Sequence, residues 1–331
     1  MNSEPALNIV ERVGDGYRVT LAPQFREPAG WRWSHFRNAA GATIRYGAID
    51  PAGPARATVV GVPGFGGFAE QWFEVVRDLT VRGFAVRLMD WRGQGGSDHY
   101  LPNSHKFHAQ GYDRDVADLQ QFLTEVVRAE GPHPLLLLGH SMGGHLGLRH
   151  LATHPGIFRG AFLTAPLLGV KTVKQAPKVV ARVARLMNLI GFGRRYIPGH
   201  ADWFFRPHYT VDDSNLSHDP LRYRVAQLYY QLKPELRIGG ATWAWLDHTF
   251  RSVAWINREE VLRRIATPVF IVQAGADHLV DNTLQDRAVK LMPQAELHAF
   301  AGAKHDILME KDEIRLPLFA DFDRFAAKVL A

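Results

Sequence analysis

The chain has 331 residues, of which 46% are hydrophobic and none is cysteine, and its formal charge is +6. This length and apolar content exclude a disordered chain and favour two domains, or one large domain with an insertion. The lack of cysteine excludes disulfides, thiolate metal ligands and a cysteine nucleophile. The first twenty residues predict neither a secretory signal nor a membrane anchor, and no later run is apolar enough to span a bilayer. We therefore expect a cytoplasmic protein.

Strand-like and helix-like segments alternate up to about residue 166. Buried strands are predicted over 57–64, 83–90, 134–141 and 160–166. Between the second and third of them, apolar residues at helical spacing predict a helix over about 113–130. This alternation is typical of parallel strands joined by crossover helices.

The pattern changes after residue 166. Residues 167–264 are helical in character and rich in Trp, Tyr and Arg, whereas 267–275 and 295–300 are again strand-like and a last helix follows. The sequence therefore predicts an α/β core, formed by residues 1–166 and 265–331, that carries a helical cap at 167–264.

The motif Gly139-His140-Ser141-Met142-Gly143 stands between a predicted strand and a predicted helix that begins at Met142. G-x-S-x-G in this context is the nucleophile elbow, a sharp turn that lifts a serine hydroxyl above the sheet. The alternative is a glycine-rich turn with an idle serine. A serine hydroxyl is a weak nucleophile at neutral pH, so Ser141 needs a base and an acid that orients the base.

The other two catalytic groups are expected at strand ends, in the chain order Ser, Asp or Glu, His. Asp277 follows the strand 267–275 and His305 follows the strand 295–300, so we predict a catalytic triad of Ser141, Asp277 and His305. Asp281 and Asp306 are competing acids; the first is expected to open a helix and the second to point away from His305. A plain loop histidine is the alternative for His305.

The tetrahedral intermediate of ester cleavage needs two N–H donors for its oxyanion. One is expected from Met142, the residue after the nucleophile, and the other from the loop Pro63–Gly67 after an earlier strand, with Phe65 as the candidate ahead of Gly66.

The elbow GHSMGG, the positions of Asp277 and His305, and the stretch LMDWRGQGGSD at 88–98 resemble serine hydrolases of the α/β-hydrolase fold, in the monoacylglycerol lipase and lysophospholipase group. The likeness is strongest to the bacterial inner-membrane-associated lysophospholipases and runs from about residue 40 to the end. It implies the triad named above, an oxyanion hole formed by Phe65 and Met142, and a lid over an acyl pocket. Monoacylglycerol lipases have His-Gly where this chain has Pro63-Gly64, which argues against a simple transfer of their specificity.

The resemblance implies hydrolysis of the carboxylic ester of a lysophospholipid or monoacylglycerol through an acyl-serine intermediate. Three alternatives use the same residues or scaffold: an acyltransferase, an esterase for small soluble esters, and a binding protein that has lost catalysis.

No cofactor is expected. His105 and His108 are three residues apart, but no further ligand is placed to complete a metal site, so none is predicted.

Positive charge is concentrated between Gly169 and Ala201, where no acidic residue occurs. The cations are Lys171, Lys174, Lys178, Arg182, Arg185, Arg194 and Arg195. Apolar residues recur at helical spacing in the same stretch: Val179, Val180, Val183, Leu186, Met187 and Ile190. Such a helix can lie on an anionic membrane, which would place the protein peripherally on the inner membrane. The alternative is a surface helix whose apolar face packs on its own protein. No nucleic-acid motif accompanies the charge, so nucleic acid is not expected as a partner.

Overall fold

The computed structural model describes residues 8–13, 16–131, 133–172, 175–206 and 210–331. Its centre is an eight-stranded sheet of order β10-β9-β8-β7-β5-β6-β4-β3. The strands are β3 (Arg32–Arg37), β4 (Thr43–Ile49), β5 (Ala57–Val62), β6 (Phe84–Met89), β7 (Leu135–His140), β8 (Gly160–Thr164), β9 (Val269–Ala274) and β10 (Ala295–Phe300). All neighbours from β10 to β6 are parallel, whereas β4 and β3 are antiparallel to their neighbours. The fold is the expected α/β-hydrolase fold.

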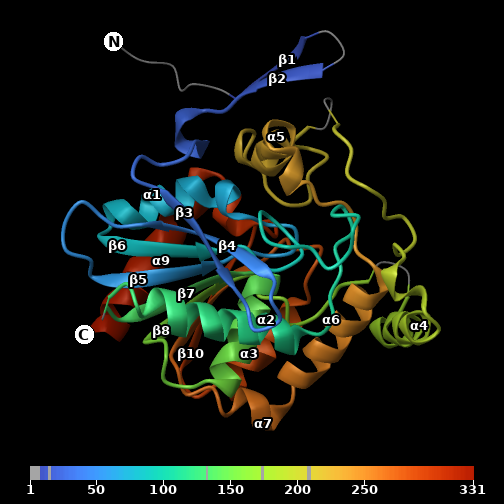
Figure 1. Ribbon diagram of the computed structural model, residues 1–331. Coiled ribbons are helices and arrows are strands. Elements are labelled where there is room, and N and C mark those ends of the chain that lie inside the picture. The colour runs from blue at the N-terminus through green and yellow to red at the C-terminus, as the bar shows by residue number, and fades with distance from the viewer. Residues whose placement is uncertain (1–7, 14–15, 132, 173–174, 207–209) are drawn as a thin grey trace.

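Helices cover both faces of the sheet, which is why its central strands are apolar throughout. The flanking helices are α1 (Phe73–Val81), α2 (Tyr112–Gln121), α3 (Met142–Thr153), α8 (Asn282–Leu291) and α9 (Asp312–Leu330). Figure 1 shows α1 and α9 on one face and α2 and α3 on the other. Arg315 of α9 binds Asp78 of α1 at 2.6 Å, and the Tyr112 ring of α2 lies against His145 of α3. The site residues are therefore carried by a sheet that is packed on both sides.

The segment between β8 and β9, residues 165–268, holds the helices α4 (Pro177–Leu189), α5 (Val225–Leu232), α6 (Trp243–Ile256) and α7 (Glu259–Leu262). We call it the β8–β9 segment. Figure 1 shows α4, α5 and α6 on the side of the molecule toward which β5 and β6 point. Short 3₁₀ turns complete the chain at Pro23–Phe25, Ala69–Trp72, Phe192–Arg194, Arg222–Arg224, Pro234–Leu236 and Ile307–Met309. The division into core and cap at residues 166 and 264 stays a prediction.

Every strand predicted from the sequence is present, with ends that differ by two residues or fewer. The helix predicted over 113–130 is only partly right: α2 ends at Gln121, and Phe122–Val127 form a π-helix that buries Phe122, Leu123 and Val127. The sequence reading missed α1, β3, β4 and a separate hairpin, β1 (Ile9–Val13) with β2 (Gly16–Thr20). Strand β3 lies at the sheet edge and reads RWSHFR with no buried residue, so it lacks the apolar run of a central strand. Within the described ranges, every helix is too short or too polar to cross a bilayer.

A buried ion cluster ties the edge of the sheet to the loops near the strand ends. The Arg45 guanidinium on β4 binds both oxygens of Glu70, at 2.9 and 2.7 Å, and Oδ2 of Asp90 through Nε at 2.7 Å. Asp90 also accepts the N–H groups of Ala69 and Gly96, each at 2.9 Å. The two carboxylates have no exposed surface. Asp90 therefore braces these loops.

Replacing Arg45 by Met should lower the free energy of unfolding by about 3–5 kcal/mol, because Glu70 and Asp90 would keep buried charge without their main partner. Urea denaturation measures the change. Arg32→Met is the matched control, since Arg32 pairs with Asp50 on the surface at 2.9 Å and such pairs contribute about 0–1 kcal/mol. Equal losses in the two variants would contradict the buried-cluster interpretation.

Candidate active site

Ser141 occupies a strained turn between β7 and α3. Its φ is 51° and its ψ is −115°, a conformation that residues other than glycine rarely adopt. The Ser141 N–H donates to the Thr164 carbonyl at 2.9 Å, and the Ser141 carbonyl accepts the Leu167 N–H at 3.0 Å. These bonds to the end of β8 hold the turn in place, so the hydroxyl stands at the carboxyl edge of the sheet.

Two glycines of the motif are required by close backbone contacts. A Cβ atom on Gly143 would lie 2.2 Å from the Val62 carbonyl oxygen and 2.5 Å from that of Pro63. A Cβ atom on Gly139 would lie 2.9 Å from the Cα atom of Gly144. Because backbone atoms cannot yield as a flexible side chain can, only glycine fits at either position. The spacing G-x-S-x-G thus follows from how α3 packs against the ends of β5 and β7.

The structure brings the predicted serine, histidine and aspartate together. His305 Nε2 lies 2.8 Å from Ser141 Oγ, and His305 Nδ1 lies 2.6 Å from Asp277 Oδ2. All three residues are buried, with 7%, 5% and 2% of Ser141, His305 and Asp277 exposed. A serine, an imidazole and a carboxylate in this order can transfer the hydroxyl proton to the imidazole.

The surroundings of Asp277 keep it ionised. Burial acts to raise the pKa of this carboxyl, but the hydrogen bond and charge of His305 outweigh it and hold the pKa below its usual value. The N–H groups of Leu279 and Val280 add to this effect by donating to Oδ1 at 2.7 and 3.1 Å. An ionised Asp277 fixes the proton of His305 on Nδ1, which leaves Nε2 free to accept a proton from Ser141.

The two competing acids have other partners. Asp281 caps α8 by accepting the Thr283 N–H at 3.0 Å, as expected of a residue that opens a helix. Asp306 points to His140, with 3.6 Å between Oδ1 and Nε2, and accepts a hydrogen bond from Gln71 at 3.4 Å. Burial raises the pKa of Asp306 to about 6. Neither acid is hydrogen-bonded to His305, so the geometry favours Asp277.

The two N–H groups proposed for the oxyanion lie beside the serine. Met142 follows Ser141 directly, and Phe65 follows Gly64, on which a Cβ atom would lie 3.0 Å from that of Ser141. Among the described residues, no acceptor pairs with the N–H of Phe65 or Met142. Both groups can therefore donate to an anionic oxygen above Ser141.

The sequence reading missed the side chains that shape this loop. Gln94 donates to the carbonyls of Gly64, at 2.8 Å, and Gly67, at 2.5 Å, and accepts the Gly66 N–H at 3.0 Å. Trp91 donates to the Pro63 carbonyl at 2.8 Å. Both lie in the stretch 88–98, and nothing in the sequence says which loop they reach.

An aromatic cluster adjoins the same loop. The Phe65 ring lies 4.1 Å from the Phe107 ring and 4.9 Å from the Trp245 ring of α6, and 37% of Phe65 is exposed. This cluster offers accessible apolar surface beside the serine.

The histidines considered as metal ligands have protein partners instead. His105 Nδ1 accepts the Trp203 N–H at 3.1 Å, and His108 Nδ1 lies 3.0 Å from the Thr242 hydroxyl. In the part of the chain that the structure describes, no group of three or more His, Asp or Glu side chains could hold a metal ion.

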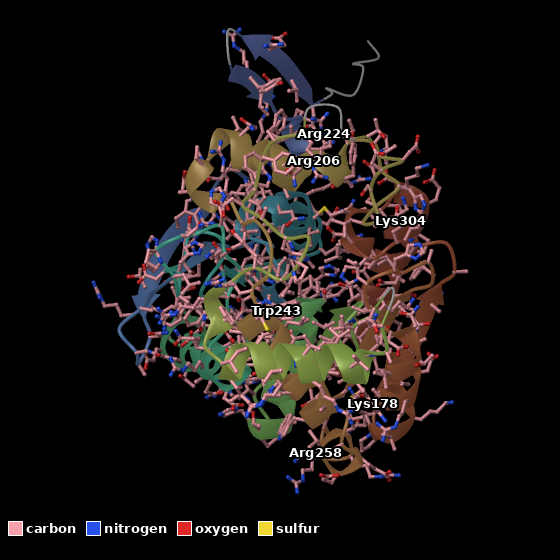
Figure 2. All side chains as sticks on the ribbon, turned by 90° about the vertical axis from the view of Figure 1, so that its right-hand side faces the viewer. Lys178, Arg206, Arg224, Trp243, Arg258 and Lys304 are labelled. Carbon is pink, nitrogen blue, oxygen red and sulfur yellow. The ribbon has the colours of Figure 1, made fainter. Side chains whose placement is uncertain are left out.

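Helix α4 has the predicted amphipathic pattern, but its apolar face is largely unpartnered. Ala184 is its one buried residue, and Val180 and Met187 are half-buried. The exposed apolar residues are Val179 (44%), Val183 (43%), Leu186 (56%), Leu189 (65%) and Ile190 (55%). Figure 2 looks onto this side and shows α4 in front. The interpretation of α4 as a helix whose apolar face packs on its own protein is thus wrong for most of that face; Lys174 lies outside the described residues.

Residues 53–312 match the Hydrolase_4 family, described as serine aminopeptidase, S33. The chain belongs to this family. It is 31% identical over 259 residues to lysophospholipase L2 of Escherichia coli K12, which covers 74% of this chain and 73% of that protein. It is 23% identical over 296 residues to human monoglyceride lipase, in an alignment that covers 89% of this chain and 90% of that protein.

Solved structures of other hydrolases have the same fold as this Hydrolase_4 member. A soluble variant of monoglyceride lipase from Saccharomyces cerevisiae, in complex with a substrate analog, gives a TM-score of 0.69 at 20% identity and covers 90% of this chain and 94% of that one. A carboxyl esterase from Bacillus coagulans gives a TM-score of 0.70 at 15% identity and covers 92% of this chain and 100% of that one. The resemblance predicted from the motifs is confirmed, and the protein is a carboxylic ester hydrolase.

Replacing Asp277 by Asn should lower kcat about 10⁴-fold, because the amide favours the wrong imidazole tautomer while leaving the packing intact. Hydrolysis of p-nitrophenyl butyrate or another activated ester measures the loss. Asp281→Asn is the control, since asparagine also caps helices, and it should keep activity within about twofold. Loss of activity in Asp281→Asn with retention in Asp277→Asn would reverse the assignment of the acid.

Proposed function

We propose that this Hydrolase_4 member cleaves the carboxylic ester of a lysophospholipid or monoacylglycerol through an acyl-serine intermediate. The observation that carries the proposal is the chain of hydrogen bonds from Ser141 Oγ through His305 to Asp277, at 2.8 and 2.6 Å. The names of the relatives, lysophospholipase and monoglyceride lipase, support the lipid class.

In the first half of the reaction, Ser141 Oγ attacks the ester carbonyl carbon while His305 Nε2 takes the hydroxyl proton. Negative charge then develops on the former carbonyl oxygen, where the N–H groups of Phe65 and Met142 donate. His305 returns the proton to the leaving glycerol oxygen as the ester bond breaks. In the second half, His305 takes a proton from water, the hydroxide attacks the acyl-serine, and the fatty acid leaves as Ser141 regains its proton.

The aromatic cluster of Phe65, Phe107 and Trp245 supports an acyl substrate over a polar one. Apolar side chains beside the nucleophile hold an acyl chain by removing its surface from water, at about 25 cal/mol per Å². The β8–β9 segment supplies Trp245 and so acts as a lid over the acyl chain in this proposal.

A fluorophosphonate probe should form a covalent adduct on Ser141 and none on Ser141→Ala, because only an activated serine reacts. Mass spectrometry locates the adduct, and its absence from the wild-type protein would favour a binding protein without catalysis.

Parallel incubation with lysophosphatidylethanolamine, monoolein and p-nitrophenyl butyrate should release fatty acid from at least one of the two lipids. Turnover of the butyrate alone would defeat the lipid proposal, and transfer of the acyl group to added alcohol in place of water would favour an acyltransferase.

We further propose that α4 and its basic flanks rest on an anionic membrane, which places the enzyme peripherally on the inner membrane. Leu186 and Leu189 on α4, and Ile190 directly after it, are more than half exposed, and Lys178 and Arg182 are exposed on the same helix. An exposed apolar stripe flanked by cations suits a lipid surface, where burial of each leucine contributes about 1.5–3 kcal/mol and each cation about 1 kcal/mol.

Leu189→Ser should therefore weaken co-sedimentation with vesicles containing phosphatidylglycerol about tenfold. Leu316→Ser on α9 is the matched control, because Leu316 and Leu189 are both 65% exposed. Rising salt should also weaken binding of the wild-type protein, since screening reduces attraction between exposed charges. Equal binding by the two variants would contradict the role of α4.

A further inference from the structure

Residues 63–67, here called the oxyanion loop, are held by hydrogen bonds from two sides. From the core, Gln94 Nε2 donates to the Gly64 carbonyl at 2.8 Å, and its Oε1 accepts the Gly66 N–H at 3.0 Å. From the β8–β9 segment, the Tyr230 hydroxyl donates to the Gly66 carbonyl at 3.0 Å. The function proposed above assigns no role to the bond from Tyr230.

The bonds of Gln94 determine the direction of the Phe65 N–H. This N–H and the Gly64 carbonyl belong to one peptide group, which is planar and trans, so the two bonds point in opposite directions. A donor that fixes the Gly64 carbonyl on one side therefore fixes the Phe65 N–H on the other. The Gly66 N–H, which Gln94 also binds, belongs to the next peptide group along the chain. One fully buried side chain thus orients both peptide groups that flank the Cα atom of Phe65.

Tyr230 holds the following peptide group from α5. Its ring lies 5.3 Å from the Phe68 ring and 5.5 Å from the Trp203 ring, and 4% of the residue is exposed. Burial raises the pKa of the Tyr230 hydroxyl above its usual value, so the hydroxyl stays protonated. It can therefore donate to the Gly66 carbonyl at every physiological pH.

Two other residues of the β8–β9 segment pack against the same loop. A Cβ atom on Gly66, whose φ is +67°, would lie 2.9 Å from Cγ2 of Ile238. The Phe65 ring lies 4.9 Å from the Trp245 ring. The position of the oxyanion loop thus depends on the β8–β9 segment as well as on the core.

We propose that Gln94 and Tyr230 are positioning residues that hold the oxyanion loop and direct the Phe65 N–H to the oxyanion above Ser141. The inference rests on the proposed function, in which this N–H donates to the tetrahedral intermediate. It deepens that function, because the β8–β9 segment then stabilises the transition state and does not only cover the acyl chain. Loss of either residue should slow the chemical steps and leave ester binding nearly unchanged.

The first test compares two neighbouring tyrosines of α5. Tyr230→Phe removes the hydroxyl that binds the loop, whereas Tyr229→Phe removes an equally buried one that donates to the Phe25 carbonyl at 2.6 Å. Tyr230→Phe should lower kcat for p-nitrophenyl butyrate about tenfold, the effect of one lost hydrogen bond, with KM within twofold. Tyr229→Phe should keep both within twofold. Equal loss of kcat in the two variants, or a raised KM at unchanged kcat, would overturn the proposal.

The second test uses a mimic of the tetrahedral intermediate. Gln94→Met removes all three bonds of this side chain to the loop and should lower kcat about 100-fold, since a misplaced group can cost that much. The inhibition constant of a trifluoromethyl ketone, whose adduct on Ser141 carries an oxyanion, should rise by the same factor. Gln120→Met is the control, because Gln120 binds His150 instead, at 2.8 Å. An unchanged inhibition constant in both Gln94→Met and Tyr230→Phe would contradict positioning of the oxyanion donor. If Gln94→Met does not fold, Tyr230→Phe carries this test.

The third test measures the loop without turnover. Hydrogen exchange in peptides that cover residues 63–67, followed by mass spectrometry, should be at least tenfold faster in Gln94→Met and Tyr230→Phe than in wild type and unchanged in Tyr229→Phe. Wild-type rates in the first two variants would overturn the proposal. Hydrolysis of the butyrate but of neither lipid would defeat the lipid substrate and leave the kinetic tests in force. If the wild-type protein cleaves no ester at all, the proposed function fails, and the exchange rates still decide whether the two residues hold the loop.

Discussion

The candidate active site depends on one backbone constraint, the positive φ of Ser141. Such a conformation costs about 1–3 kcal/mol for a residue with a side chain. The neighbours that hold it are hydrogen bonds to Thr164 and Leu167 at the end of β8 and the contact of Gly143 with the loop after β5. The same turn presents the hydroxyl to His305 and leaves the Met142 N–H at the start of α3 without an intrahelical acceptor. The candidate nucleophile and a candidate oxyanion donor are thus placed by a single feature of the chain.

The sheet and the candidate triad could be predicted from the sequence because each depends on local pattern. The strands β5 to β9 are buried on both faces, so they read as short apolar runs, and Asp277 and His305 are found by counting from strand ends. The parts that were missed depend on tertiary contacts. Strand β3 has no buried residue, so it lacks the apolar run by which a central strand is predicted. The π-helix after Gln121 buries Phe122 and Val127, and this packing is not visible in the sequence pattern. Gln94 shapes the loop beside Ser141 through contacts across 27 to 30 positions in the chain.

Helix α4 shows a different limit of sequence reading. Its periodic pattern correctly predicts an amphipathic helix, but a pattern does not say what the apolar face contacts. In the structure α4 is held to α6 by polar bonds, with Asn188 and Arg185 donating to the buried Asp247 at 2.8 and 3.4 Å. Because those bonds turn one side of α4 inward, most of the larger apolar side chains remain in contact with solvent. The unpartnered face is therefore a consequence of how the helix is anchored.

The loop that carries His305 is joined to the β8–β9 segment by a dense set of hydrogen bonds. The buried carboxylate of Glu310 accepts the N–H of Lys304 at 2.8 Å and the N–H of His218 at 2.9 Å. Lys304 Nζ donates to the Ser214 carbonyl at 2.6 Å, and the Asp306 N–H donates to the Leu216 carbonyl at 2.8 Å. This part of the β8–β9 segment and the imidazole of His305 thus belong to one hydrogen-bonded unit. A substrate group that contacts this part of the β8–β9 segment would be fixed relative to His305, so binding energy gained there would act directly on the alignment of the ester with Ser141.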